Sequence, residues 1–507
     1  MWRGLYEIVP LTEIKDIAGP YVGSAIHTFT NVITHVIKDA MPHLKDPENS
    51  YMVYDGELPS LKSAIVGGSD ILSTIHPNYL LVALTMVVAF FILYIKMKYP
   101  FWNQIPALHV YDLHRRYLYP EKPYIVHVIP KKTKYYESRL VKTERFQDLE
   151  ESRKQYIATL LQNHYLPSDR VFCSVKVTDL AAQCANALIS TWNRIEDDIS
   201  LNVLQTDIKN PTPIISVHSK IREVEGFITS RKINTALSLG TSDNRYIVQE
   251  PANYIDYLCF NPTNTSPLNI RKLFHTHEYN ERMVFPERQI TLFKKEVELC
   301  EAIVPLVEYE TLTFYLRYQI EPSKLPRNFQ LVRIQRENLR HLHDWMERVA
   351  SLKDSAGFKV SVTAEIGDLI HLLQTNQMFA YVLRGPDPEI KTKMDMVYAI
   401  YFFRNAHMKY EDLEGGDTLH ATAAFCNTND TELYFLGFVW AVREARKDFS
   451  GTETKMLMVD DLGHLRGVVK RWQQTHDVVL RTKCAYYFCN YVVPRSPYSA
   501  EMVNILT

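Results

Sequence analysis

The sequence predicts a mixed α/β protein that follows one membrane-spanning helix. Residues 79–95 carry no charge, which is typical of a segment that lies in lipid. Beyond them, segments with helical spacing of apolar residues alternate with short segments rich in β-branched and aromatic residues, and the chain has 31 Tyr and 22 Phe. With 507 residues, of which 46% are hydrophobic, the chain is long enough for two or three domains with cores of their own.

Residues 1–78 are predicted to form a helical arm on the non-cytosolic side of the membrane. Within the arm, residues 22–41 place apolar side chains at steps of three and four, as an amphipathic helix does. The sequence leaves open whether this helix lies on the membrane or packs on a neighbouring protein.

Residues 79–95 are predicted to be the transmembrane helix, with a buried core helix as the alternative. Lys96 and Lys98 end the apolar run as interfacial anchors do. Because Lys and Arg follow the run and are scarce before it, the large C-terminal part is expected on the cytosolic side. The sequence therefore predicts a single-pass membrane protein with the lipid bilayer as a partner.

Charge and cysteine content narrow the functional class. Lys and Arg number 57 against 58 Asp and Glu, a net charge of -1, whereas a nucleic-acid-binding protein normally carries a basic field. All seven cysteines lie beyond residue 95, without metal-ligand spacing or a secreted framework, which indicates free thiols in a reducing compartment. His275 and His277 are two residues apart and do not share a helix face, so no metal site is expected.

After the apolar run, helical and strand patterns alternate. Helices are predicted over 144–166, 268–283, 341–352 and 432–449. A pair of strands is predicted within 225–239, and further strands over 253–262, 378–385, 396–405, 419–427 and, as the final strand, 483–494. The order of helix, strands, helix and strand occurs twice, around 145–310 and 335–495, which suggests a duplicated fold without a sequence repeat.

The segment 254–274 is the most informative for chemistry. A strand ends near Phe260, an uncharged loop follows, and Ser266 and Pro267 are suited to the N-cap and the first position of a helix. Free backbone N–H groups at such a helix start form an anion site. An ordinary strand-to-helix connection is the alternative.

Several motifs in order resemble the N-myristoyltransferase family. The strand Tyr257-Leu258-Cys259-Phe260, the opening Phe101-Trp102 with Pro106, the segment 226–239 and the strand 486–494 carry this resemblance. It implies two acetyltransferase-like (GNAT) lobes, 96–325 on the acyl-CoA side and 326–507 on the peptide side. Residues 274–283 and 292–296 are most similar to membrane-anchored relatives in giant DNA viruses.

The resemblance also implies site residues. The backbone N–H groups of Tyr257 and Leu258 would form an oxyanion hole, and the α-carboxylate of Thr507 would accept a proton from the amine of a peptide with an N-terminal glycine. Burial beside Ile505 and Leu506 would raise the pKa of that carboxylate above its usual value of about 3.3–3.7. Contacts with acyl-CoA, of which myristoyl-CoA is the family's form, fall on Phe101, Trp102, Cys259, Phe260, Ser266, Leu268, Asn269 and Ile270.

The sequence also departs from the family. Thr265, Pro267 and Leu268 stand where the family has cations, and Arg271 and Lys272 lie one turn into the helix, from which side chains lean back toward its start. Leu480-Arg481-Thr482 replaces a glycine-rich turn.

Two main hypotheses follow, with a receptor or adaptor of unrelated fold as the third. In the first, the chain is a structural component of a large DNA virus particle or its inner membrane, with capsid or other virion proteins as partners and a degraded acyl-CoA site. In the second, it is an active acyl-CoA:protein N-acyltransferase of the glycylpeptide N-tetradecanoyltransferase type.

Overall fold

The computed structural model describes most of the chain beyond residue 76. The described residues are 77–112, 115, 122–166, 171–198, 218–240, 244–263, 266–316, 322–347, 352, 357–386, 396–410, 416–449 and 454–507. The helical arm predicted over 1–78 therefore lies almost entirely outside them. The chain divides into two compact units, Glu7–Pro100 and a larger one of Met1–Tyr6 with Phe101–Thr507, and each is described by itself.

In the smaller unit, the predicted helix is present as α4 (Pro77–Lys98). Its last turn holds Lys96 and Lys98, and the Lys98 ammonium lies 5.7 Å from the ring centre of Tyr94. Among the residues that the structure describes, no helix has the length and apolarity needed to cross a membrane, so the predicted transmembrane span is not supported.

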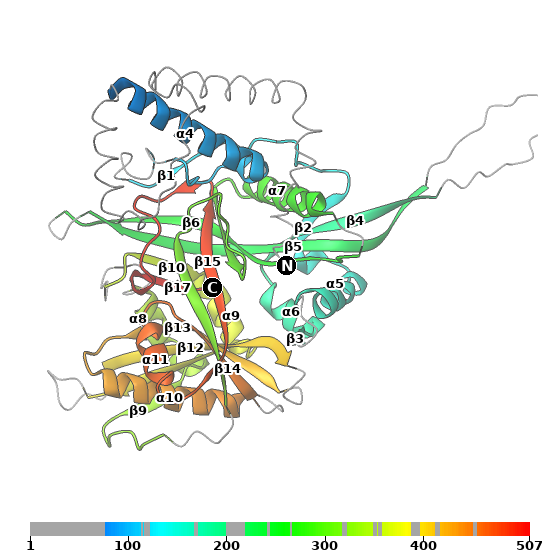
Figure 1. Cartoon of the computed structure of the whole chain (residues 1–507). Helices are drawn as coiled ribbons and strands as arrows, with labels where there is room; N and C mark the ends of the chain where they lie inside the picture. Colours follow the sequence, from blue (N-terminus) through cyan, green and yellow to red (C-terminus); the bar gives the residue numbers. More distant parts are fainter. Residues whose placement is uncertain are drawn as a thin grey trace, which may run out of the picture. The chain divides into compact units, whose positions relative to one another are not determined.

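The larger unit is organised around one sheet of fifteen strands (Figure 1). Its main path runs through β17 (Val503–Leu506), β10 (Val360–Ala364), β5 (His218–Leu239), β6 (Tyr246–Phe260), β7 (Ile290–Glu296), β15 (Val478–Cys489), β8 (Val307–Tyr315), β14 (Thr454–Asp460), β13 (Asp417–Cys426), β12 (Met396–Tyr410), β11 (Met378–Gly385) and β9 (Gln330–Arg333). Off this path, β4 (Leu188–Asp198) joins β2 (Val141–Arg145) to β5, and β3 (Val171–Cys173) pairs with β12. A separate pair consists of β1 (Tyr124–Ile125) and β16 (Tyr491–Val492).

Helices cover the sheet on its different parts. They are α5 (Glu151–His164), α6 (Val177–Gln183), α7 (Pro267–Val284), α8 (Arg340–Trp345), α9 (Ile366–Gln374), α10 (Thr431–Asp448) and α11 (Leu465–Trp472). Figure 1 shows α7 on one side of β4 and β5, with α5 and α6 on the other. Successive side chains of a strand point to opposite faces of the sheet, which explains this arrangement. Ile189 of β4 packs in the core with α5, while the next residue, Ser190, hydrogen-bonds to His277 of α7.

Two strands from the C-terminal half complete the N-terminal part of the sheet. β10 pairs with β5, and β17 pairs with β10 in parallel, with Leu506 opposite Thr363. The two predicted lobes therefore share one continuous sheet, and their predicted boundary at 325/326 stays a prediction.

Most predicted elements are confirmed, with three corrections. The helix predicted over 144–166 begins at Glu151 as α5, because Val141–Arg145 pair with β4 as strand β2. The strands predicted over 253–262, 378–385 and 419–427 correspond to β6, β11 and β13. The segment 225–239 is one strand within β5 rather than a pair, because its backbone runs on without a turn and its two halves pair with different neighbours, β4 and β10. The strand predicted over 483–494 is divided into β15 and β16 at Asn490, whose φ is 61°. The final strand of the structure is β17, which was not predicted.

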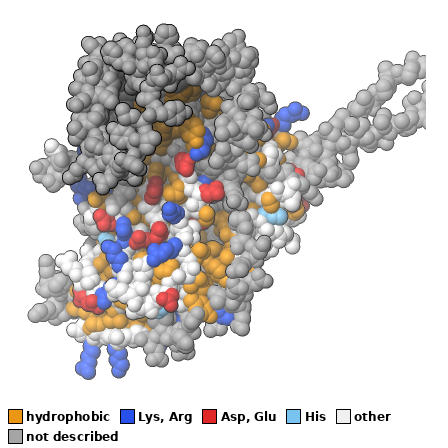
Figure 2. All heavy atoms as spheres, viewed as in Figure 1, with side chains coloured by type: hydrophobic (Ala, Val, Ile, Leu, Met, Phe, Trp, Pro, Cys, Tyr) orange, Lys and Arg blue, Asp and Glu red, His pale blue; other side chains and the backbone are white. Residues whose placement is uncertain are grey.

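The surface shown in Figure 2 agrees with the balanced composition. On this face, Lys and Arg side chains are interspersed with Asp and Glu side chains, and neither sign forms a continuous field.

Candidate functional site

The strands β6 and β7 separate in the middle of the sheet. They pair in parallel only over Ala252–Ile255, opposite Ile290–Phe293. Beyond that point β6 stays on β5 as far as Phe260, whereas the end of β7 pairs only with β15. The pairing register also shifts where Ile255 and Tyr257 face Ser230 and Thr229, which leaves Asp256 as the extra residue of a bulge. The strand predicted over 253–262 thus lies at a splayed cleft.

A cavity of about 510 Å³ opens at this separation. Its walls include residues 254–258 of β6, 294–296 of β7, 404–408 of β12 and Thr507. The volume lies in the range of small-molecule and cofactor sites, about 300–1,000 Å³.

The structure brings the three residues predicted to be catalytic to the wall of this one cavity. Thr507 is 6% exposed, because β17 carries it into the sheet beside β10. Tyr257 and Leu258 lie on β6, where the cleft begins. However, the Tyr257 N–H donates to Thr229 Oγ1 at 3.2 Å, so one of the two predicted oxyanion donors already has an acceptor.

Four of the eight residues predicted to contact acyl-CoA have buried side chains, namely Phe101, Trp102, Cys259 and Phe260. Phe101 and Trp102 are buried, and Trp102 stacks on Phe293 of β7 with ring centres 5.5 Å apart. Phe101 lies 6.0 Å from Phe274 of α7, so this aromatic cluster packs α7 against β7. They do not line the cavity.

Cys259 and Phe260 of β6 do not line the cavity either. The Cys259 thiol lies in the core against α5 and donates to the Leu160 carbonyl at 3.5 Å. The ring of Phe260 lies 6.2 Å from that of Trp192. Burial raises the pKa of Cys259 well above its usual range, which keeps the thiol protonated and unreactive.

The predicted anion site falls at the start of α7, and it stays a prediction. Ser266 is the N-cap and Pro267 the first residue, as predicted, and the Ser266 side chain accepts no capping hydrogen bond. Ser266 and Leu268 are exposed, whereas Asn269 and Ile270 are half-buried, so the first turn is open to solvent on one side. Of the cations one turn further on, Lys272 forms an ion pair with Glu137 at 3.1 Å. Thr265 lies outside the described residues.

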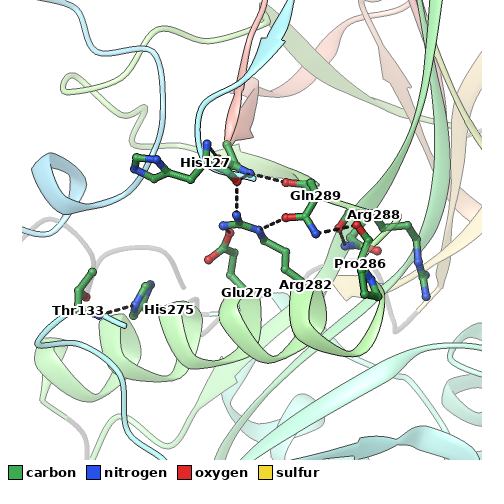
Figure 3. A network of polar contacts seen from close by, with 10 residues as sticks. His127, Thr133, His275, Glu278, Arg282, Pro286, Arg288 and Gln289 are labelled. Carbon is green, nitrogen blue, oxygen red and sulfur yellow. Dashed lines mark hydrogen bonds and ion pairs between the residues drawn. The ribbon is translucent and has the colours of Figure 1, made fainter. Parts of the chain in front are cut away.

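A polar network fixes the other end of α7 (Figure 3). Arg282 donates to Glu278 Oε1 at 2.7 Å, to Gln289 Oε1 at 3.0 Å and to the His127 carbonyl. Asn490, the asparagine matched in the family strand, donates to the same His127 carbonyl at 2.9 Å. Because Arg282 and Glu278 are buried, this network resists displacement of α7 relative to the strands behind it.

A second chain of hydrogen bonds joins the middle of α7 to β4 and β5. Burial lowers the pKa of His277 to about 3, so its imidazole is neutral at ordinary pH. Each group of the chain can then donate a hydrogen bond to the next. The chain runs from Asn280 through Thr143, Ser190, His277 and Ser230 to Glu281, with distances of 2.7 to 2.9 Å before the final Ser230–Glu281 bond. Burial raises the pKa of Glu281 to about 8.

The cavity wall carries several ion pairs and one strained histidine. Arg231 bonds Asp256 at 2.9 Å, and Lys294 bonds Glu296 at 2.7 Å. His407 has φ of 49° at an irregularity of β12, and its Nε2 lies 2.9 Å from Gln183 Nε2. Gln183 also accepts a hydrogen bond from the Tyr257 hydroxyl, so these groups join the two sides of the cavity. Four further residues line the cavity without any signal in their local sequence, namely Arg231, Arg404, His407 and His420.

Comparisons with solved structures show the fold. N-myristoyltransferase of Saccharomyces cerevisiae with bound myristoyl-CoA superposes with a TM-score of 0.55 and 9% identity, over 80% of this chain and 94% of that one. The same enzyme with myristoyl-CoA and inhibitors gives a TM-score of 0.51 and 12% identity, over 79% and 91%. No protein-family model and no curated sequence matches the chain. The predicted mixed α/β fold with N-myristoyltransferase-like GNAT lobes is confirmed.

Proposed function

We propose that this protein is an acyl-CoA-dependent N-acyltransferase that acts on the N-terminal amine of a peptide. The observation that carries the proposal is the placement of Tyr257, Leu258 and Thr507 on the wall of one cavity at the separation of β6 and β7. Yeast N-myristoyltransferase, which has this fold, is known with bound myristoyl-CoA, which makes a long-chain acyl-CoA the first ligand to test.

In the proposed reaction, the amine nitrogen attacks the thioester carbonyl, the new C–N bond forms, and the C–S bond breaks. The Leu258 N–H, and the Tyr257 N–H once it releases Thr229, stabilise the negative charge on the carbonyl oxygen. A carboxylate on Thr507 takes the proton from the amine, and the departing CoA thiolate is protonated in turn. This role requires that Thr507 ends the mature chain, which mass spectrometry of the C-terminal peptide checks.

The pyrophosphate of the CoA moiety would bind at the open first turn of α7. Backbone N–H groups there attract anions, and the Ser266 side chain does not occupy them. Lys272 is engaged by Glu137, so this site relies on the backbone more than on charged side chains. We therefore expect weaker salt dependence of CoA binding than a cation-rich loop would give.

A second candidate is a binding protein without turnover, which includes the predicted structural role in a virus particle. Two contacts favour it: the Tyr257 N–H is already bonded to Thr229, and Lys272 is already paired with Glu137. The giant-virus relation, the capsid or virion partners and the single-pass placement with a cytosolic C-terminal part remain predictions attached to this candidate.

The test uses the full chain, myristoyl-CoA and a glycine-initiated peptide. Calorimetry measures binding of myristoyl-CoA, and mass spectrometry measures the acylated peptide. Binding with transfer supports the acyltransferase, binding without transfer supports the second candidate, and the absence of binding contradicts the proposed acyltransferase. Transfer that persists after residues are added beyond Thr507 would remove Thr507 as the base.

A pair of variants tests the oxyanion donor. Thr229→Val frees the Tyr257 N–H and is expected to raise the rate of transfer, by up to about 100-fold if that N–H is worth a full oxyanion-hole donor. Thr235→Val is the matched control, because Thr235 lies on the same strand and donates to the Glu250 carbonyl at 2.8 Å, away from the cavity. Equal rates for the two variants would contradict the assignment of Tyr257.

A further inference from the structure

The cavity contains an arginine without an acidic partner. Arg404 lies on β12 opposite His420 of β13, and both line the cavity. Its Nε–H donates to His420 Nδ1 at 3.4 Å, and no carboxylate among the described residues lies within ion-pair distance of its guanidinium. By contrast, Arg231 and Lys294 in the same cavity have Asp256 and Glu296 at 2.9 and 2.7 Å.

A row of side chains across adjacent strands sets the orientation of Arg404. His420 Nε2 lies 3.2 Å from Asp460 Oδ1 on β14, and Thr311 on β8 donates to the same oxygen at 2.6 Å. Because an arginine Nε–H only donates, His420 Nδ1 must be the bare nitrogen, which places the ring proton on Nε2, toward Asp460. The Nε of Arg404 is thereby committed, and its two Nη groups, with four N–H donors, remain for the cavity.

Arg404 also acts on the part of β6 where the proposed chemistry takes place. Burial raises the pKa of Asp256 and that of Tyr257, and the positive charge of Arg404 is among the groups that oppose both increases. A ligand that enters between Leu258 and Thr507 would therefore lie in the field of this guanidinium.

The chemistry of the ligand follows from these contacts. A guanidinium that faces a cavity without a bonded acid is costly, and a planar carboxylate satisfies its fork with two parallel hydrogen bonds. The phosphates of CoA are assigned to the first turn of α7 instead. Ser266 and Leu268 of that turn do not line this cavity, so the two anion sites are separate.

We propose that Arg404, oriented by His420 and Asp460, binds a carboxylate of the acceptor, so that the preferred peptide carries an acidic residue close to its N-terminal amine. The identity of the acceptor as a peptide rests on the proposed function, whereas the anion subsite rests on the geometry alone.

The experiment compares two families of peptides by fluorescence anisotropy, with the full chain and a dye at the peptide C-terminus. One family has Glu at the second, third or fourth position after an initial Gly, and the other has Gln at the same position. Wild-type protein is expected to bind the best Glu peptide about tenfold to 100-fold more tightly than its Gln counterpart, as charge-assisted hydrogen bonds predict. Coenzyme A is present in one series and absent in the other.

Variants assign the preference to Arg404. Arg404→Gln should equalise the two peptides, and Arg404→Lys, which keeps the charge without the fork, should keep part of the preference. Arg471→Gln, a half-buried position on α11 outside the cavity, is the matched control and should keep all of it. Since Arg404 has no acid partner to lose, Arg404→Gln should leave the urea midpoint unchanged or higher.

Three results would overturn the subsite. They are equal affinity of wild type for the Glu and Gln peptides, no binding of either, and a preference that survives in Arg404→Gln. The wild-type comparison needs no variant to fold. Because the readout is binding, a lack of acyl transfer with the Glu preference intact would contradict the proposed function and leave the anion subsite standing.

Discussion

Glu281 allows the hydrogen-bond chain under α7 to be tested quantitatively. Its side chain is 1% exposed, it accepts a hydrogen bond from Ser230, and its other oxygen has no hydrogen-bond partner among the described residues. Burial therefore raises its pKa from an ordinary 4.5 to about 8. We predict that Glu281→Gln, which keeps the acceptor for Ser230 and cannot ionise, makes the protein more stable at neutral and alkaline pH.

The sign and size follow from proton linkage. Below about pH 4.5 the carboxyl group is protonated in both states and contributes nothing. Between about 4.5 and 8 the unfolded chain releases a proton that the folded chain keeps, so the free energy of unfolding falls as pH rises. At about 1.4 kcal/mol per pH unit, this interval sets an upper limit of about 5 kcal/mol, reached above pH 8.

Urea denaturation, followed by tryptophan fluorescence from pH 5 to 9, measures this effect. The difference in the free energy of unfolding between Glu281→Gln and wild type should widen up to about pH 8 and then stay constant, because all other titrating groups cancel. Glu432→Gln, whose side chain is 77% exposed on α10, is the matched control and should give a difference independent of pH. A constant difference for Glu281→Gln would refute the assignment of a protonated buried carboxyl group.

Two further predictions concern the same part of the molecule. His277 has a pKa lowered to about 3 by burial, so the protein should lose stability as pH falls from about 6.5 to 3, and His277→Gln should reduce this slope in urea midpoints; parallel curves would contradict it. A Cβ on Gly226 would lie 2.3 Å from the ring of Phe260, so Gly226→Ala should cost about 1–3 kcal/mol in thermal denaturation. Gly367→Ala, where a Cβ meets nothing within 4 Å, should cost nothing, and equal losses for both would refute the clash.

Local rules predicted the part of the site that depends on neighbouring residues in sequence. Ser266 marks a helix start because serine is preferred at the N-cap, and Pro267 does so because the first helical position needs no N–H donor. The structure begins α7 at these residues. The strand that ends at Phe260 was equally clear from its β-branched and aromatic residues.

The anion subsite could not be predicted, because it depends on the register of distant strands. Arg404, His420 and Asp460 come from three strands, and only the pairing of β12, β13 and β14 places them in one row. A single sequence contains no signal that fixes the register among these three strands. The strand β17 could not be predicted for the same reason. Its four residues form a strand by pairing with β10, which lies far away in the sequence.

The place of β17 has a consequence for how the protein is made. Residues 503–507 are the last of the described part to be synthesised, yet Val503–Leu506 form the edge strand beside β10 and Thr507 forms part of the cavity wall. The pocket is therefore complete only once residue 507 has left the ribosomal exit tunnel. No ligand that needs this wall can stabilise the nascent chain, so earlier stages of folding depend on the other strands of the sheet.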